Sequence, residues 1–331
     1  MPKVSIVIVN YNYGKYLDER IRTILNQSYK DFELIIVDNG STDNSVEIIN
    51  HYISDSRVIP NFYPENVSPY KRWNYAADIA QGDYLLISSA DDSCHPRMLE
   101  KLTEKLDNHP EVGLAYTQSI EIDNEGTTLR SFKQYTDELD IDHWSSDFIN
   151  SGKEECKYLF FKCTIPNSSG VLMRRKIFIE SGKFDVQMPF SADWMLYAKI
   201  LMNSDIAFVA EPLNYHRIHP NVMRKNNRDD IFLEERLQVL YYLFNHLQPP
   251  DSFITKIYDP TIGWWLRVIA SGKSTFSGNQ RIYRILKDIN PTLNYRVVKN
   301  LIEIVKRKLK ISSNLSDSIL VDNKAFTDSI K

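Results

Sequence analysis

Two adjacent aspartates, Asp91 and Asp92, directly follow an apolar run at 84–90. Neighbouring carboxylates repel each other unless a cation lies between them or water solvates both. Carboxylate oxygens are ligands that Mg²⁺ and Mn²⁺ prefer, and such a site leaves coordination positions open for a substrate's phosphates. The same stretch, with Ser93 ahead of Pro96, is also good chemistry for capping a helix. The doublet therefore predicts either a metal and phosphate site or a solvated helix cap.

A second polar cluster, VDNGSTD, contains Asp38 and Asn39 just after another apolar run. A carboxylate accepts from a ring N–H, and an amide both donates and accepts, so this pair could bind a nucleobase or a ribose. The segment is equally typical of a turn that leads into a helix. The candidate caps for that helix are Ser41, Thr42 and Asp43.

Two further candidates lie late in the chain. Asp193 stands among apolar residues in SADWMLYAKI, where partial burial would raise its pKa toward the working range of a general base. It would also suit the N-cap of the helix that begins there. The segment YHRIHP places Arg217 between two histidines, a set that can bind phosphate or complete a metal shell, although a histidine on a surface strand usually does neither.

Short apolar runs alternate with amphipathic segments in the first third of the chain, and they predict the elements that position these clusters. Buried strands are expected at 4–9, 32–41, 57–64 and 84–90. Helices are expected between them at 16–28, 41–53 and 70–80. Because parallel strands joined by helices end at one edge of a sheet, NYNYG, DNGSTD and SADDS should converge on a single site.

The rest of the chain changes character. Further elements are a strand at 113–123, a polar irregular region at 127–160, a strand and short helix at 168–182, a helix at 193–203 and a final strand pair at 206–219. Beyond residue 221 the pattern is helical, with a stripe at 237–247, a helix at 264–270 ended by Gly272, a helix at 293–310 and a polar, loosely held tail after Ile311. We therefore expect an α/β domain over 1–225 and a helical extension over 226–331.

Composition excludes several classes of protein. The 331 residues are 43% apolar with a formal net charge of −3, so charge gives no support for a nucleic-acid partner. No apolar run is long enough for a membrane-spanning helix, and the N-terminus lacks a signal-peptide pattern. The three cysteines form no close CxxC pair, which indicates reduced thiols. We expect a cytoplasmic protein.

Six segments, taken in chain order, resemble the family 2 glycosyltransferases of the GT-A fold. They are VSIVIVNYN, FELIIVDNGSTDNS, AQGDYLLISSADD, GVLMRRKIFIESGKFD, SADWMLYAKI and YHRIHP, and they cover roughly residues 3–220. The resemblance implies a mixed, mostly parallel sheet flanked by helices. It also implies an inverting, hexosyltransferase-type enzyme with a nucleotide-diphosphate sugar as donor. The acceptor would be a hydroxyl of a glycan or a lipid-linked saccharide, in bacterial surface-polysaccharide synthesis.

The resemblance implies roles for residues at the donor site. Val9 and Tyr11 would line the nucleotide pocket, and Asp38 or Asn39 would contact the base. Because Asn39 stands where many relatives have a second acidic residue, the preferred base stays open among uracil, thymine and guanine.

The resemblance also implies the reacting groups. Asp91 would lie near the ribose or a Mn²⁺ or Mg²⁺ ion, Asp92 on that ion, and His219 on the diphosphate or the ion. Asp193 would be the catalytic base. By position, the loop region is expected to shape the acceptor side through Trp144, Phe148, Tyr158 and Phe161.

Two departures from the family pattern leave an alternative open. Ser89 stands where many relatives have an acidic residue, and Ala192 replaces the glutamate that commonly precedes the catalytic aspartate. The alternative is a catalytically impaired protein of the same fold that binds sugar nucleotides.

The segment at 293–310 predicts a basic amphipathic helix. Its apolar face would carry Val298, Leu301, Ile302 and Val305. Around it stand Arg296, Lys299, Lys306, Arg307, Lys308 and Lys310, against the single acid Glu303. Such a helix can lie on an anionic membrane, here the inner membrane surface, or pack on the catalytic domain with a solvated basic edge.

Overall fold

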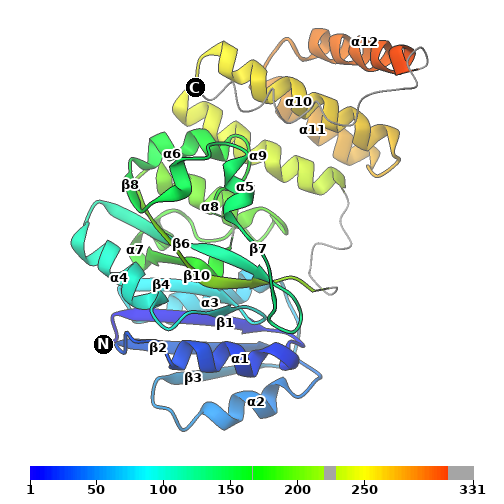
Figure 1. Cartoon of the computed structure of the whole chain (residues 1–331). Coiled ribbons are helices and arrows are strands. Elements are labelled where there is room, and N and C mark those ends of the chain that lie inside the picture. Colours follow the sequence, from blue (N-terminus) through cyan, green and yellow to red (C-terminus); the bar gives the residue numbers. More distant parts are fainter. Residues whose placement is uncertain (166, 220–228, 312–331) are drawn as a thin grey trace. The chain divides into compact units, whose positions relative to one another are not determined.

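The computed structural model describes residues 1–165, 167–219 and 229–311, and the chain divides into two compact units (Figure 1). Unit 1 consists of Met1–Leu159 and Cys163–Val222, and unit 2 of Phe160–Lys162 and Met223–Lys331. The boundary predicted at residue 225 and the tail predicted after Ile311 lie outside the described residues.

Unit 1 is built on one mixed sheet, and its first four predicted strands are confirmed. They are β1 (Val4–Asn10), β2 (Phe32–Asn39), β3 (Val58–Tyr63) and β4 (Tyr84–Ser89). They pair in parallel in the order β3-β2-β1-β4. Every residue of β1 and β2 is buried, as expected for strands that helices cover on both faces.

Beyond β4 the sheet continues through β9 (Val171–Arg174), β6 (Val112–Ile122), β10 (Asp205–Arg217) and β5 (Ser93–Cys94). The short strands β7 (Thr128–Ser131) and β8 (Phe148–Asn150) pair with β6 and β10. β9 is antiparallel to both β4 and β6, while β10 is parallel to β6. The strands β1, β2, β3, β4, β6 and β10 therefore run in one direction, and their carboxyl ends share one edge.

Helices cover both faces of this sheet. α1 (Gly14–Leu25), α2 (Ser45–Tyr52) and α4 (Met98–Asn108) share one hydrophobic core with the first face. α3 (Pro69–Ile79) packs on β1 and β2 from the other side, which Figure 1 shows as α1 in front of the sheet and α3 behind it. α8 (Ala192–Leu201) packs on β6 and lies beside α6 (Gly152–Leu159) and α7 (Arg175–Glu180).

Two predicted caps differ from the structure. Asn44 occupies the N-cap position of α2, while Asp43 accepts a hydrogen bond from the backbone N of Ser45 at 3.0 Å. α4 begins at Met98 with Arg97 at its N-cap, so the helix-cap interpretation of the aspartate doublet is wrong.

The expected strand pair at 206–219 is a single strand, β10. Its register against β6 shifts on both sides of Pro212. Proline has no N–H to give to the ladder and is found at bulges and edges, so it bends the strand without ending it.

The region at 127–160 is more ordered than its polar sequence predicts, since it contains β7, α5 (Lys133–Asp137), β8 and α6. The expectation that its aromatic residues shape an acceptor surface is wrong for Trp144 and Tyr158, which are each only 2% exposed. Their rings pack against each other and against His143. These aromatics therefore stabilise the core of unit 1.

Unit 2 is helical. Its helices are α9 (Asp229–Leu247), α10 (Asp251–Ala270), α11 (Phe276–Ile289) and α12 (Leu293–Ile311). α10 is longer than predicted and ends as predicted just before Gly272, whose φ of +70° suits a helix end. α11 was not predicted, although six of its fourteen residues are apolar. None of the helices in the described part of the chain has the length and apolar character needed to cross a membrane.

Candidate active site

The loops that follow β1 and β2 are joined by hydrogen bonds at the carboxyl ends of these strands. The buried amide of Asn10 donates to Asp38 Oδ1 at 3.0 Å and to Ser41 Oγ at 3.0 Å. Asn12, with a φ of +59°, accepts from the backbone N of Thr42 at 2.7 Å. Asparagine tolerates this left-handed conformation better than most residues. The predicted convergence of NYNYG and DNGSTD is therefore confirmed.

The side chain of Asn39 forms its hydrogen bonds with other groups of the protein. Its Oδ1 accepts from Arg72 Nε at 2.8 Å and from the backbone N of Val67 at 3.2 Å. Its Nδ2 donates to Asn66 Oδ1 at 2.8 Å and to the backbone O of Val67 at 2.7 Å. An amide has two donor hydrogens and one acceptor oxygen with two lone pairs, so all four positions are filled. Asn39 thus fixes the loop after β3 in place.

Among the other residues predicted to contact the nucleotide, Tyr11 is the most exposed. Tyr11 is 39% exposed at the end of β1, whereas Val9 is 8% exposed and Asp38 only 2%. Sequence reasoning missed Arg72, whose guanidinium stacks over the ring of Tyr63 at 3.6 Å. There was little indication of this contact in the sequence, because Tyr63 and Arg72 lie on different elements and no local sequence pattern connects them.

Asp92 is a buried anchor with protein partners on both oxygens. It is 1% exposed, and its Oδ1 accepts from the backbone N of Arg217 at 2.9 Å. His216 Nδ1 lies 3.3 Å from the same oxygen. Its Oδ2 accepts from Ser169 Oγ at 2.6 Å and from Asn167 Nδ2 at 3.1 Å. Asp92 therefore joins the end of β4 to β10 and to the segment before β9.

The charge of Asp92 is stabilised where it lies. Burial alone would raise the pKa of its carboxyl, but the hydrogen bond and charge of His216, helped by Arg20, hold that pKa well below its usual range. Burial likewise opposes protonation of His216, yet its hydrogen bond to Asp92 raises the pKa of the imidazole. The two side chains thus favour each other's charged forms.

Asp91 faces the other way and meets the end of β10. His219 Nε2 lies 2.9 Å from Asp91 Oδ2, and the carboxylate is 14% exposed. The imidazole of His219 also contacts two aromatic rings, those of Tyr13 at 5.6 Å and Tyr16 at 5.2 Å between centroids. Burial and the nearby aspartates raise the pKa of Tyr13 to about 12, so its hydroxyl stays protonated. The third predicted cluster therefore joins the other two.

Arg217 connects these parts. Its Nε donates to the backbone O of Asp91 at 2.8 Å, and its Nη1 to the backbone O of Asp123 at 2.9 Å. Its Nη2 pairs with Glu19 Oε2 at 2.6 Å, and its guanidinium lies 5.0 Å from the ring of Tyr16. Sequence reasoning identified Arg217 as a phosphate-binding candidate. In the structure its side chain is 1% exposed and holds the site together.

Replacing Arg217 with alanine should lower the free energy of unfolding by about 3 kcal/mol, because buried carbonyls and a carboxylate lose their charged donor. Urea unfolding followed by tryptophan fluorescence measures this loss. Arg97→Ala is the matched control, since that side chain is 45% exposed and its ion pairs with described residues are to the exposed Glu100 and Glu211. Equal midpoints for the two variants would show that Arg217 does not organise the site.

Asp193 is the second residue of α8, with Ser191 at the N-cap position, so the N-cap interpretation is not what the structure shows. The side chain is partly buried, and its Oδ1 accepts from the backbone N of Trp194 at 2.8 Å. α8 leads through a short turn into β10 and packs on the parallel strand β6. The C-terminus of α8 therefore lies near the amino end of β10, which starts at Asp205.

Asp91 and His219 are the side chains at this edge whose chemistry suits a divalent cation. Asp91 Oδ2 and His219 Nε2 form a hydrogen-bonded pair at 2.9 Å, and a cation held by both atoms would replace that single hydrogen bond. Among the residues that the structure describes, no group of three or more metal-ligating side chains is found. A pair of protein ligands suits an ion whose other positions are filled by substrate phosphates and water. Carboxylate with imidazole is compatible with Mn²⁺, while Mg²⁺ favours oxygen ligands more strongly.

The sequence matches a known protein family and resembles glycosyltransferases of other organisms. A model of the family "Glycosyl transferase family 2" matches residues 5–182. An uncharacterized glycosyltransferase of Methanocaldococcus jannaschii is 29% identical over 317 residues, which cover 94% of this chain and 97% of that protein. An uncharacterized glycosyltransferase of Haemophilus influenzae is 45% identical over 111 residues, which cover 33% of this chain and 44% of that protein.

Two solved structures share the fold. S. aureus TarS in complex with UDP-GlcNAc superposes with a TM-score of 0.63 at 15% identity, over 87% of this chain and 80% of that one. A mannosyltransferase from Pyrobaculum calidifontis, in complex with GDP-Man and Mn²⁺, superposes with a TM-score of 0.55 at 14% identity, over 93% of this chain and 87% of that one. At such identities the likeness supports the fold alone.

Proposed function

Because the chain belongs to glycosyltransferase family 2 and has the GT-A fold, we propose that it moves a sugar from a nucleotide-diphosphate donor to an acceptor hydroxyl with inversion. The acceptor is a glycan or a lipid-linked saccharide, and bacterial surface-polysaccharide synthesis is the setting we favour. The observation that carries the proposal is the meeting of the loop after β1, the loop after β2 and the Asp91–His219 pair at one sheet edge. The nucleotide sugars bound by the two structural neighbours support the donor class.

We assign the divalent cation, Mn²⁺ or Mg²⁺, to Asp91 and His219. Bound there, it would offset the negative charge that develops on the departing diphosphate. Asp92 was expected on the cation itself, but both of its oxygens already accept hydrogen bonds from protein groups. We therefore propose that Asp92 positions Asp91 and the end of β10.

Asp193 is the proposed general base. It takes the proton of the acceptor hydroxyl as that oxygen forms a bond to the anomeric carbon, while the bond to the diphosphate oxygen breaks on the opposite face. The nucleoside diphosphate leaves with the bonding electrons.

Binding without turnover remains the second candidate, and Ser89 and Ala192 are the observations that favour it. The backbone N of Ser89 donates to Ser169 Oγ at 2.9 Å, and that hydroxyl donates to Asp92 at 2.6 Å. Hydrolysis or transfer of the donor sugar in the presence of Mn²⁺ excludes this candidate.

A nucleotide-diphosphate sugar with Mn²⁺ should raise the melting temperature of the intact chain. A ligand at 100 times its Kd stabilises the folded state by about 2.7 kcal/mol, which corresponds to a shift of several degrees. Screening uridine, thymidine and guanosine diphosphate sugars by thermal shift also identifies the base. The same sugars with EDTA are the control and should shift the melting temperature less. If no nucleotide-diphosphate sugar produces a shift, the proposed function fails.

We also propose that α12 contacts an anionic membrane surface. Its exposed apolar residues are Tyr295, Val298, Leu301 and Ile302, which are 45–73% exposed. Lys299 and Lys306 flank them with exposed charge. The predicted contributions of Val305, Arg307, Lys308 and Lys310 lie outside the described side chains. Apolar and basic groups together are typical of helices that lie on anionic lipid.

Sedimentation with vesicles tests this contact. The intact chain should bind phosphatidylglycerol vesicles at low salt and lose most of that binding at about 0.5 M salt. It should not bind neutral vesicles. Leu301→Glu should weaken binding at low salt. Ile269→Glu, which changes an exposed isoleucine on α10, is the matched control. Equal binding by both variants, or no salt effect, would contradict the proposal.

A further inference from the structure

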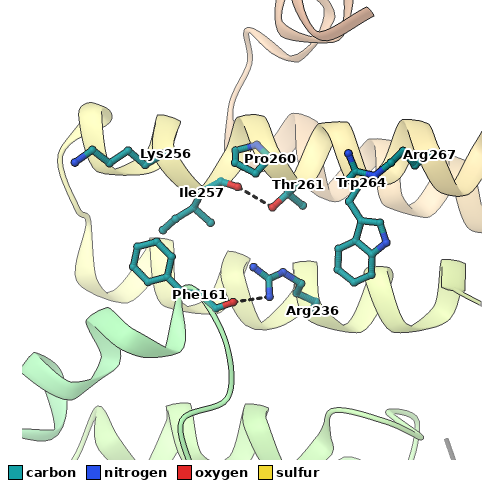
Figure 2. A pocket seen from close by; sticks show the side chains of 8 residues that line it. All are labelled: Phe161, Arg236, Lys256, Ile257, Pro260, Thr261, Trp264 and Arg267. Carbon is teal, nitrogen blue, oxygen red and sulfur yellow. Dashed lines mark hydrogen bonds between the residues drawn. The ribbon is translucent and has the colours of Figure 1, made fainter. Parts of the chain in front are cut away.

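Unit 2 contains a cavity of about 260 Å³ between α9, α10 and the segment at 160–162 (Figure 2). Three of the residues that line it are cations, namely Arg236, Lys256 and Arg267. Phe161 and Trp264 contribute aromatic rings. No carboxylate is among the described residues that line the cavity. Its walls thus combine positive charge with flat apolar surface.

α10 contributes Pro260 and Thr261 to the wall of this cavity. Pro260 lies inside the helix and cannot donate to the hydrogen-bond ladder, and interior prolines bend helices. Thr261 next to it donates its hydroxyl to the backbone O of Ile257 at 2.7 Å, which Figure 2 shows as a contact along the cavity wall. Side chains of both helices face the space between them.

Arg236 is held in position before any ligand arrives. Its Nη1 donates to the backbone O of Phe161 at 2.7 Å, and its guanidinium lies 6.0 Å from the ring of Trp264. In Figure 2 it points from α9 into the gap that Trp264 borders from α10. A positioned guanidinium loses little entropy when it binds, and its planar fork matches carboxylate and phosphate oxygens.

We propose that this cavity binds a single sugar residue that carries a phosphate or a carboxylate. The cations recognise the anionic group, and the aromatic rings bury the apolar C–H face of the sugar. The volume is slightly below the 300–1,000 Å³ that is typical of sites for drug-sized ligands, so one sugar residue suits it better than a nucleotide-diphosphate sugar. That this residue belongs to the acceptor glycan rests on the proposed function; the binding itself does not.

Calorimetric titration of the intact chain with glucose 6-phosphate, glucuronate, glucose and inorganic phosphate tests the proposal. The buffer contains EDTA and no donor sugar, so the measured binding does not depend on sugar transfer. A chain without transferase activity can still bind the anionic sugars, and an active transferase can fail to bind them. The two anionic sugars should bind, and glucose should bind at least tenfold more weakly because it lacks the charged group. Inorganic phosphate should also bind more weakly, because it has no ring to stack.

Two variants locate the site. Arg267→Gln removes one lining charge from an exposed position, so the fold should persist, and it should weaken glucose 6-phosphate binding by about tenfold. Arg284→Gln makes the same change at an exposed position on α11 and should leave binding unchanged. The proposal is overturned if no anionic sugar binds, if glucose or phosphate binds as tightly as glucose 6-phosphate, or if the two variants bind alike.

Discussion

Replacing Asp193 with asparagine should lower the rate of sugar transfer by roughly 10²–10⁴-fold, the contribution of a well-placed general base. Asparagine keeps the shape of the side chain but cannot take the proton of the acceptor hydroxyl. In the proposed mechanism the donor makes its contacts at the ends of β1, β2 and β4, so its binding should survive. Steady-state kinetics give the rate, and a thermal shift with donor and Mn²⁺ gives the binding.

Two controls accompany this variant. Asp185→Asn changes an exposed carboxylate in the same unit and should leave the rate unchanged. Asp193→Glu restores a carboxylate and should recover part of the rate. An Asp193→Asn variant that retains most of its turnover would show that another group removes the proton.

The second prediction with a large effect distinguishes the role of Asp91 from that of Asp92. Asp91→Asn should reduce the affinity for Mn²⁺ by about 100-fold or more, since the charged ligand is lost, and transfer should fall with it. Its stability should change little, because the Asp91 carboxylate is partly exposed and its contact is the imidazole of His219. Titration of activity with Mn²⁺ and urea unfolding measure the two quantities.

Asp92→Asn should behave in the opposite way. It leaves the partners of a buried carboxylate imperfectly matched, which should lower the free energy of unfolding by about 1–3 kcal/mol. The main effect of Asp92→Asn should be this loss of stability. The Mn²⁺ concentration required for half-maximal activity should change less than it does in Asp91→Asn. If Asp92→Asn keeps full stability and loses the metal response, the cation lies on Asp92, as the family resemblance implies.

The adjacent aspartates also show where sequence reasoning stops. Apolar runs and alternation were sufficient to predict β1 to β4, their parallel pairing and the convergence of three polar clusters, since these follow from local pattern and sheet topology. Which of two identical neighbouring side chains is buried depends on β10 and on Ser169, groups 77 or more positions away. No local pattern encodes that choice.

Asn39 illustrates the same limit in a different way. Its position after β2 was predicted, and so was its hydrogen-bonding capacity. Its actual partners are Val67, Asn66 and Arg72 in the loop and helix after β3, so its amide is used to hold the fold. The cavity in unit 2 was not predicted at all, because Arg236 and Trp264 come together only when α9 and α10 pack.

The proposal that a divalent cation binds Asp91 and His219 is tested most directly by anomalous diffraction. Crystals of the chain grown with a nucleoside diphosphate and Mn²⁺ should give one strong manganese peak at bonding distance from the Asp91 carboxylate and the His219 imidazole, with diphosphate oxygens completing the shell. A peak bonded to Asp92 instead, or none at the carboxyl edge of the sheet, would contradict the account.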